Sequence, residues 1–370
     1  MIDTLKFYNY LIEKEMDFFA GVPDSLLSNI SACITKNAPK GKQIISANEG
    51  NAIALCAGYH LSSGNFGVAY MQNSGIGNAV NPLLSLTDEK VYSIPMLLII
   101  GWRGEPGTKD EPQHVTQGEL TIPLLDTVKI TSIILADNFK KQVDDCYKYM
   151  KQHNKPIALI VKKGTFSDYK LEMKKSSHQL TREVALETIL NNLGNDDFIV
   201  STTGKASREI FELREKHNQN HANDFLTVGS MGHTASIALG VSLGTEKAVY
   251  CVDGDGSFLM HMGSFPINTS VAKKNFKYIM INNGAHESVG GQPTVAFDID
   301  IKSILLGSGF EKVLIASTVD EINDYILQVK EKPLHALVIN TRQGSRDDLG
   351  RPTTTPVDNK LAFMKKINEQ

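Results

Sequence analysis

Short apolar runs alternate with amphipathic segments along the first 162 residues of the chain. The apolar runs predict strands at residues 17–20, 43–46, 67–71, 95–101 and 156–161. Between them, apolar residues recur at helical spacing, as in residues 49–61 and 140–152. Because strands and helices alternate, this half is predicted to be α/β, with a parallel sheet covered by helices.

A polar, lysine-rich stretch ends this pattern at residues 163–180 and predicts an interdomain linker. Beyond it, a second α/β set is predicted, with strands at residues 198–201, 248–252, 278–281 and 336–340. Thr181 is expected to cap a helix whose inward residues are Val184, Leu186, Ile189, Leu190 and Leu193. We therefore expect two similar α/β domains, at residues 1–165 and 181–370, joined by a linker at 166–180, with no middle domain.

Length and composition narrow the class of protein. A chain of 370 residues is long enough for two or three domains with apolar cores. Its net charge of −3 argues against a nucleic-acid or anionic-membrane partner. The longest apolar stretch, residues 94–101, is too short for a membrane span, and no signal peptide is visible. The four cysteines lack CxxC spacing, which fits a reducing compartment. We expect a cytoplasmic protein that acts on a small molecule.

Two polar motifs follow apolar runs in the second half of the chain. Residues 252–257 read Val-Asp-Gly-Asp-Gly-Ser, and residues 282–284 read Asn-Asn-Gly. One helix would fit between them, so the segment predicts a βαβ unit with Asp255 and Asn283 past the carboxyl ends of parallel strands. Oxygen ligands at such an edge suit Mg²⁺ or Ca²⁺ and a phosphate-bearing ligand. Ordinary turns are the alternative, since both motifs are rich in turn residues.

The Gly-Asp-Gly-Ser motif followed by Asn-Asn resembles the thiamine diphosphate (ThDP) signature of ThDP-dependent decarboxylases and synthases. The resemblance implies that Asp255, Asn283 and the carbonyl of Ala285 bind Mg²⁺. The motif is one residue longer between its two parts than is usual in pyruvate decarboxylases. The resemblance also implies a pyrimidine-binding first domain and a diphosphate-binding second domain. The cofactor-binding residues that it implies in the second domain include Gly254, Asp255, Gly256, Ser257 and Asn283.

Three further segments match this family. Residues 48–52, Asn-Glu-Gly-Asn-Ala, resemble its glutamate motif, which would place Glu49 on the pyrimidine ring; stabilisation of a helix N-terminus is the alternative. In residues 229–232, the resemblance implies that Met231 supports the bent cofactor and that the Gly229 carbonyl accepts from its amino group. Close helix packing would equally explain the small residues there. Gly204 and Lys205 follow a predicted strand and are candidates for diphosphate or substrate contacts.

Two loops are predicted to serve the substrate. Residues 21–25 follow a strand, and the family resemblance implies an acidic or hydroxyl side chain over the cofactor. Asp24 and Ser25 are therefore catalytic candidates, with helix capping as the alternative. Residues 101–114 form a long, glycine-rich, charged segment, which predicts a lid or a solvated surface turn.

Longer strings at residues 21–25, 283–288, 290–294 and 344–352 resemble the phosphonopyruvate decarboxylase family, which is close to the sulfopyruvate decarboxylases. The implied substrate is a 2-oxoacid with a second anionic group, and the implied assembly is a homo-oligomer with active sites at subunit interfaces. The implied reaction is decarboxylation of 3-phosphonopyruvate. Sulfopyruvate decarboxylase, a carboligating transferase and a non-enzymatic metal- or nucleotide-binding protein are the alternatives. His114 and Glu287 are candidates for proton transfer after CO₂ leaves. Candidates for anion binding, each with surface charge as the alternative, are Arg103, Lys109, Lys205, Arg346 and Arg351.

Overall fold

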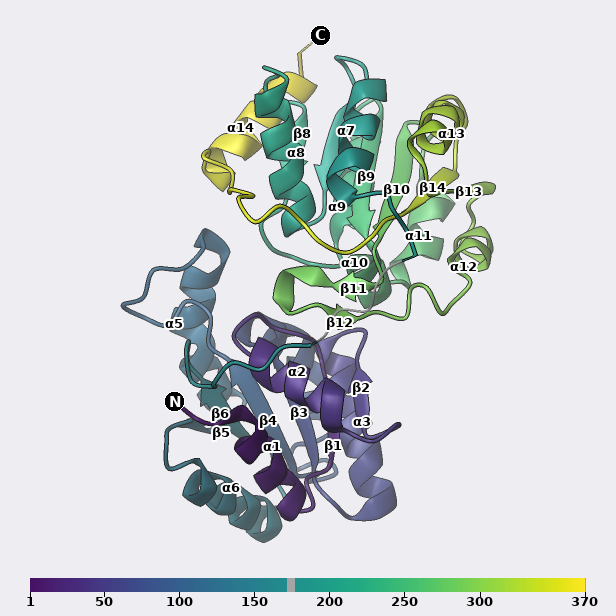
Figure 1. Ribbon diagram of the computed structural model, residues 1–370. Helices are drawn as coiled ribbons and strands as arrows, with labels where there is room; N and C mark the ends of the chain where they lie inside the picture. The colour runs from purple at the N-terminus through teal and green to yellow at the C-terminus, as the bar shows by residue number, and fades with distance from the viewer. Residues whose placement is uncertain (172–176, 370) are drawn as a thin grey trace. The chain divides into compact units, whose positions relative to one another are not determined.

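The computed structural model describes residues 1–171 and 177–369 (Figure 1). The chain divides into two compact units. The N-terminal unit comprises Met1–Met173 and His286–Gln292, and the C-terminal unit comprises Lys174–Ala285 and Pro293–Gln370. Residues 172–176, in the middle of the predicted linker, lie outside the described residues, so the linker stays a prediction.

The N-terminal unit is built on a six-stranded sheet in the order β2-β1-β3-β4-β6-β5, in which every pairing is parallel. All five predicted strands are present, with shifts of one residue at some ends. The sixth, β5, was not predicted, because this edge strand is half-buried to exposed and lacks a buried apolar run. The strands are β1 (Phe18–Gly21), β2 (Gln43–Ile45), β3 (Gly67–Gln72), β4 (Met96–Gly101), β5 (Thr131–Ile134) and β6 (Ile157–Val161).

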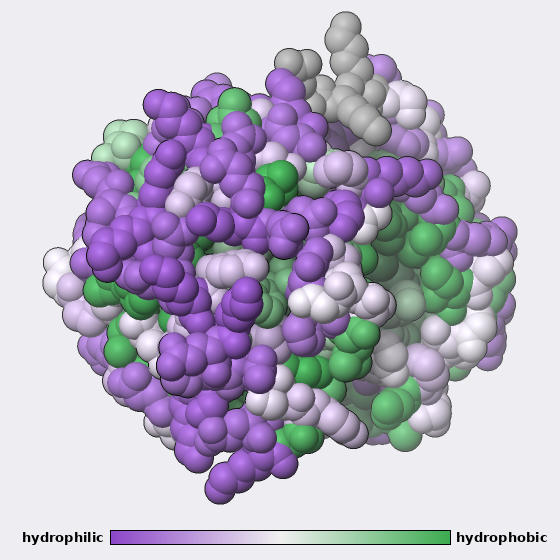
Figure 2. Space-filling view, turned by 90° about the horizontal axis from the view of Figure 1, so that it is seen from below, coloured by the Kyte–Doolittle hydropathy of each residue, from purple (hydrophilic) through white to green (hydrophobic). Residues whose placement is uncertain are grey.

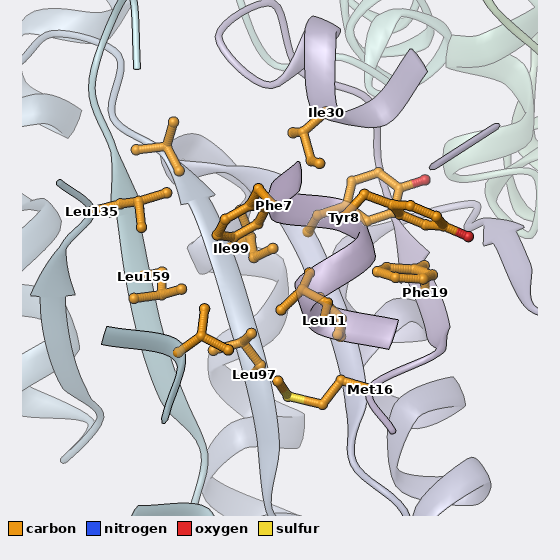
Figure 3. Packing of buried hydrophobic residues seen from close by; sticks show 14 of the residues in the cluster. Phe7, Tyr8, Leu11, Met16, Phe19, Ile30, Leu97, Ile99, Leu135 and Leu159 are labelled. Carbon is orange, nitrogen blue, oxygen red and sulfur yellow. The ribbon is translucent and has the colours of Figure 1, made fainter. Parts of the chain in front are cut away.

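Helices cover both faces of this sheet because alternate strand residues point to opposite sides. Helices α1 (Thr4–Glu13), α2 (Ser28–Asn37) and α6 (Phe139–His153) share one apolar cluster with the sheet. Figure 3 shows this packing, in which Phe7 and Leu11 of α1 lie on the side of Ile99 and Leu97 of β4, and Tyr8 lies beside Phe19. The opposite face is covered by α3 (Glu49–Ser63), α4 (Ile76–Ser85) and α5 (Pro112–Thr127), with a 3₁₀ turn, η1 (Asn73–Gly75), before α4.

The C-terminal unit repeats this plan with a parallel sheet in the order β13-β14-β10-β9-β7-β8. The four predicted strands are confirmed, and the two that were missed, β8 and β13, are again the edges of the sheet. The strands are β7 (Phe198–Ser201), β8 (Asp224–Leu226), β9 (Val249–Gly254), β10 (Phe276–Asn282), β13 (Lys312–Ala316) and β14 (His335–Asn340). A separate two-stranded ribbon joins β11 (Ala285–His286) and β12 (Gln292–Pro293), with η2 (Glu287–Val289) between them.

Helices again lie on both faces. One face carries α7 (Arg182–Asn192), α8 (Lys205–Lys216) and α13 (Val319–Glu331). The other carries α9 (Thr234–Leu243), α10 (Asp255–Met260), α11 (Ser264–Val271), α12 (Ile301–Gly307) and α14 (Pro356–Ile367). The two parallel, helix-covered sheets confirm the predicted fold class.

Two local predictions need correction. The segment between the two polar motifs forms two helices, α10 and α11, because the chain leaves the helical path between Met260 and Ser264. Thr181 does cap α7 by accepting from the Val184 N–H, but the Val184 side chain is exposed. Val184 lies two residues before the buried Leu186, which turns it about 200° around the helix and away from the core.

The surface, the helices and the cysteines each add one observation. Figure 2 shows polar residues over much of the visible face and apolar residues gathered on its right side. Among the described residues, none of the helices combines the length and the apolar character that a membrane crossing needs. All four cysteines are buried free thiols.

We expect Phe7→Ala to lower the stability of the N-terminal unit by about 3–5 kcal/mol, because it leaves a cavity in the packed face of α1. Denaturant unfolding can be followed through Trp102, the single tryptophan, which lies in this unit. Leu5→Ala on the exposed side of the same helix is the control and should cost less than about 1 kcal/mol. Equal losses for the two variants would contradict the packing described here.

Candidate functional site

Asp255 and Asn283 lie at the carboxyl ends of two paired strands. β9 and β10 are parallel neighbours, and Gly254 is directly opposite Ile281 in their register. Asp255 follows Gly254 as the first residue of α10, and Asn283 follows the last residue of β10. The prediction that the two strands are neighbours is therefore confirmed.

Asp255 is a buried carboxylate held by a few polar groups. Its side chain is only 3% exposed, and the Thr294 hydroxyl donates to Oδ2 at 2.5 Å. Burial raises the pKa of Asp255 to about 6, although Thr294 and the backbone N–H of Asn283 oppose this shift. Asn283 is also buried, and its Oδ1 accepts from the Ala285 N–H at 3.1 Å. A cation beside this pair would stabilise the ionised form of Asp255.

These residues fit a hard divalent cation. The carboxylate of Asp255, the amide oxygen of Asn283 and the carbonyl of Ala285 are oxygen donors, which Mg²⁺ and Ca²⁺ prefer. Within the described ranges, no cluster of three or more His, Cys, Asp or Glu side chains could hold a metal ion. A cation here would therefore complete its coordination with further oxygens, such as those of a bound phosphate group.

Neighbouring turns bring the other predicted cofactor residues to the same sheet. Ser257 Oγ accepts from the Gly232 N–H at 3.1 Å, which ties the Gly-Asp-Gly-Ser motif to the turn that contains Gly229 and the half-buried Met231. Gly232 has a φ of 87°, and a Cβ there would come within 2.5 Å of the His261 ring. At the end of β7, Gly204 has a φ of 97° and precedes Lys205, the first residue of α8.

In the N-terminal unit, polar residues follow four adjacent strands of the sheet. Glu49 follows β2, Asp24 follows β1, Asn73 follows β3 and Arg103 follows β4. Because the strands are parallel, their carboxyl ends lie at one edge, where open α/β sheets bind ligands. The sequence predicted three of these residues, and the structure adds Asn73.

Glu49 is a buried acidic residue in the first turn of α3. Its side chain is 5% exposed, and Asn78 Nδ2 donates to Oε2 at 2.7 Å. The capping of α3 is done by Asn48, whose side chain accepts from the Asn51 N–H. A Cβ on Gly75 would lie 2.3 Å from Glu49 Oε1, so the carboxylate needs a glycine beside it.

Asp24 is fully buried beside Arg103. Its Oδ2 accepts from the Leu26 N–H at 3.1 Å, and Oδ1 has no hydrogen-bond partner among the described residues. Burial raises the pKa of Asp24 to about 6, and the Arg103 charge opposes the shift. Asp24 is not the N-cap of α2, which begins at Ser28 after Leu27, but its carboxylate accepts a backbone N–H in the turn that precedes this helix.

Arg103 joins Asp24 and Ser25 to the long charged loop. Its Nη1 donates to Ser25 Oγ at 2.8 Å, and its Nε donates to Asp110 Oδ2 at 2.8 Å. Nη2 also donates to Asp110, so the ion pair is bidentate. The Arg103 pair lowers the pKa of Asp110 to about 2. Asp110 was not predicted as a site residue, although its position in the charged loop was a signal.

The loop is shorter than predicted because α5 begins at Pro112. His114 therefore lies in the first turn of a helix; its side chain is 8% exposed, and its Nδ1 has no partner among the described residues. Burial and then the charge of Arg103 lower the pKa of His114. Lys109 is exposed in the loop.

The remaining candidates lie in different surroundings. Arg346 forms ion pairs with Glu183, Glu212 and Asp348, which raise its pKa and occupy its guanidinium. This arrangement does not favour anion binding by Arg346. Arg351 is exposed, and Glu287 is half-buried in η2.

Both units of the chain match domains of known proteins. Residues 6–129 match the thiamine pyrophosphate enzyme N-terminal TPP binding domain, and residues 202–333 match the C-terminal TPP binding domain. Phosphonopyruvate decarboxylase from Streptomyces viridochromogenes is 34% identical over 92% of this chain and 88% of its own length. The enzyme of the same name from Streptomyces hygroscopicus is 33% identical over 95% and 90%. Sulfopyruvate decarboxylase from Methanosarcina acetivorans is 28% identical over 76% of each.

The two matched domains define a thiamine pyrophosphate enzyme of the two-domain kind, with no middle domain evident. Within that class, the chain belongs to the phosphonopyruvate decarboxylase family.

Asp24→Asn is expected to raise the free energy of unfolding at pH 8 and to change it little at pH 4. A carboxyl whose pKa rises on folding stabilises the protein below its unfolded pKa, and this contribution is lost as the pH rises through about 6. The rise in pKa from 3.8 to about 6 corresponds to a loss of at most about 3 kcal/mol in the free energy of unfolding at high pH. An asparagine at position 24 does not ionise and would not cause this loss.

Urea unfolding at the two pH values measures this effect. Asp110→Asn is the matched control, because the pKa of Asp110 falls to about 2 and its charge is stabilising above that range. This second variant should lose stability at pH 8. A gain for Asp24→Asn of the same size at both pH values would refute the assignment of its pKa.

Proposed function

We propose that this chain is a ThDP- and Mg²⁺-dependent decarboxylase that converts 3-phosphonopyruvate to phosphonoacetaldehyde and CO₂. In this reaction the bond from the carbonyl carbon to the carboxylate breaks, CO₂ leaves, and a proton takes its place. The main support is the 34% identity over 92% of the chain with a phosphonopyruvate decarboxylase. The buried Asp255 beside Asn283, in a domain of the matching kind, is consistent with it.

Residues of the C-terminal unit would bind the cofactor. Asp255, Asn283 and the Ala285 carbonyl would hold Mg²⁺, for which they have the right donor atoms. When bound, ThDP supplies an electron sink for the pair released as CO₂ leaves. We assign diphosphate and ring contacts to Gly204, Lys205, Gly229, Met231, Gly254, Gly256 and Ser257.

Glu49 would hold a proton on the N1′ atom of the pyrimidine ring. Its burial supports this role, because a carboxyl shielded from water can make a strong hydrogen bond to a ring nitrogen. Asn78 would keep the carboxyl in position by donating to Oε2 at 2.7 Å.

Arg103 is the best-supported candidate for the second anion of the substrate. Three of its five N–H groups donate to Asp110 and Ser25, and the other two have no partner among the described residues. Its side chain is only 18% exposed, so an anion there would be shielded from solvent. Lys109, Lys205 and Arg351 remain candidates for additional contacts.

Asp24 is better suited than His114 to supply the proton that replaces CO₂. A general acid works best with a pKa near the working pH, and the pKa of Asp24 is about 6. Burial lowers the pKa of His114, so near neutral pH its ring would be uncharged and would act as an acceptor or orienting group. Ser25 would assist through its contact with Arg103, and Glu287 stays a second candidate for proton transfer.

We also propose that the chain forms a homo-oligomer and works in a reducing compartment such as the cytoplasm. Large apolar side chains that remain exposed on α3 and α4, including Leu61 at 72% and Leu84 at 42%, support a subunit contact. The four buried free thiols are consistent with a reducing environment.

Sulfopyruvate decarboxylation is the second candidate function, supported by the 28% identity with the enzyme from Methanosarcina acetivorans. The two substrates differ in charge, because a sulfonate carries one negative charge where a phosphonate can carry two. A third candidate, transfer of the decarboxylated fragment to a second carbonyl, would appear as a longer product when an aldehyde acceptor is added.

A CO₂-release assay tests the proposal. Purified protein is stripped with a chelator, and phosphonopyruvate, sulfopyruvate and pyruvate are compared with and without added Mg²⁺ and ThDP. We expect release from phosphonopyruvate to be fastest and to require both additions. Faster CO₂ release from sulfopyruvate would favour the second candidate. CO₂ release that does not depend on added Mg²⁺ and ThDP would show that the ThDP assignment is wrong.

Glu49→Gln should lower kcat by at least about a hundredfold while the fold stays intact, because an amide cannot hold the same proton. Circular dichroism and the thermal midpoint check folding, and steady-state CO₂ release checks turnover. Glu13→Gln is a control at an exposed glutamate on α1 and should behave as wild type. Near-normal turnover in Glu49→Gln would rule out the proton-holding role.

A further inference from the structure

Asn73 makes hydrogen bonds to both main-chain polar groups of Arg103. It lies in η1, directly after β3, and is 4% exposed. Its Nδ2 donates to the Arg103 carbonyl at 2.8 Å, and its Oδ1 accepts from the Arg103 N–H at 3.2 Å. One carboxamide thus satisfies both backbone groups of a residue thirty positions away.

This contact continues the sheet where its own ladder stops. The pairing of β3 with β4 ends at Gln72 opposite Gly101. At Arg103, two residues after Gly101, the Asn73 side chain supplies the donor and acceptor that another strand residue would supply. The backbone of Arg103 is therefore fixed although it lies in a loop, and buried backbone groups that would cost free energy unpaired are satisfied.

The same carboxamide also reaches helix α5. Nδ2 donates to Thr121 Oγ1 at 2.8 Å, and Thr121 in turn donates to the Gln117 carbonyl. The loop packs closely on this helix, since a Cβ on Gly118 would lie 1.6 Å from the Gly104 carbonyl oxygen. Nearby, Trp102 Nε1 donates to the Gly118 carbonyl at 2.8 Å.

We infer that Asn73 is a positioning residue that sets the direction of the Arg103 guanidinium and so the preference of the enzyme for a substrate with a second anion. Arg103 leaves the backbone at a point held by Asn73, and its guanidinium is then held by Asp110 and Ser25. Two N–H groups of Arg103 have no partner among the described residues. Without the backbone contacts, these groups would no longer point in a fixed direction. The identity of the anion rests on the proposed function; the anchoring of the loop does not.

A purely structural role for Asn73 predicts something different. If Asn73 only joined η1 to α5, loss of either Nδ2 contact would have the same effect. The binding of every substrate would then be weakened to the same extent. Thr121 separates the two roles, because Thr121→Val removes the contact to α5 and leaves both contacts to Arg103 in place.

The test compares Asn73→Leu, which fills the space without hydrogen bonds, with Thr121→Val in holoenzyme reconstituted with Mg²⁺ and ThDP. Binding of phosphonoacetate, which carries a carboxylate and a phosphonate, and of pyruvate is measured by titration calorimetry. We expect Asn73→Leu to weaken the binding of phosphonoacetate by about tenfold or more. This is the effect expected when a hydrogen bond to a charged group is lost. The affinity of Asn73→Leu for pyruvate should stay within about twofold of wild type. The affinity of Thr121→Val for both ligands should also stay within about twofold of wild type. Asn73→Ala replaces Asn73→Leu should the latter fail to fold.

Trp102 provides a second measurement that needs neither turnover nor ligand. It is the only tryptophan and adjoins Arg103, so its fluorescence reports the loop directly. Asn73→Leu should shift the emission and increase quenching by acrylamide, and Thr121→Val should leave both near wild type. Unchanged Trp102 emission in Asn73→Leu, or equal weakening of phosphonoacetate and pyruvate, would overturn the inference.

Arg103→Lys tests whether Asn73 acts through Arg103. This variant should weaken the binding of phosphonoacetate at least as much as Asn73→Leu does. If phosphonoacetate binds this variant as it binds wild type, the route through Arg103 is wrong. A wild-type enzyme that releases CO₂ from none of the 2-oxoacids would refute the proposed function instead, and the Trp102 comparison would still decide whether Asn73 anchors the loop.

Discussion

The burial of carboxylates at the edges of two parallel sheets is the constraint on which the rest of this structure depends. Asp255 in one unit and Asp24 and Glu49 in the other are all at most 5% exposed. Burying an ionised carboxylate is costly unless it is paired or hydrogen-bonded. The protein tolerates this cost because the neighbouring groups are fixed: the Thr294 hydroxyl for Asp255, the Asn78 amide for Glu49 and the Arg103 charge near Asp24.

The parallel sheets explain why these groups can be fixed so far from one another in sequence. Every strand of a parallel sheet ends at the same edge, so each loop there starts from a rigid point. In the C-terminal unit this brings residues 255 and 283 together through the pairing of β9 and β10. In the N-terminal unit it brings Ser25 at the end of β1 into a hydrogen bond with Arg103 at the end of β4, and the charge of Arg103 acts on the neighbouring Asp24.

Much of this arrangement could be predicted from the sequence, and the failures have physical causes. Buried central strands gave clear apolar runs, but β5 and β13 are edges where fewer residues are buried, and β8 is an edge strand of only three residues. Asp255, Asn283 and Glu49 could be recognised because their motifs are local. The role of Asn73 could not be recognised, because it depends on which strands are neighbours. The charged loop pointed to Asp110 only in general terms, because its pairing with Arg103 depends on how the loop folds back. Arg346 had the right charge, but it is paired with Glu183 and Glu212 from distant segments and with the nearby Asp348.

Two glycines show how little room the acids have. A Cβ on Gly101 would lie 2.1 Å from Asp24 Oδ2, just as one on Gly75 would meet Glu49. Each acid therefore occupies the volume that a neighbouring side chain would otherwise fill. Tolerance to substitution at positions 75 and 101 is then conditional: a larger residue fits only where the acid at position 49 or 24 has been replaced by something shorter. In a combinatorial library, these pairs of positions should vary together, and a scan of single changes would miss the dependence.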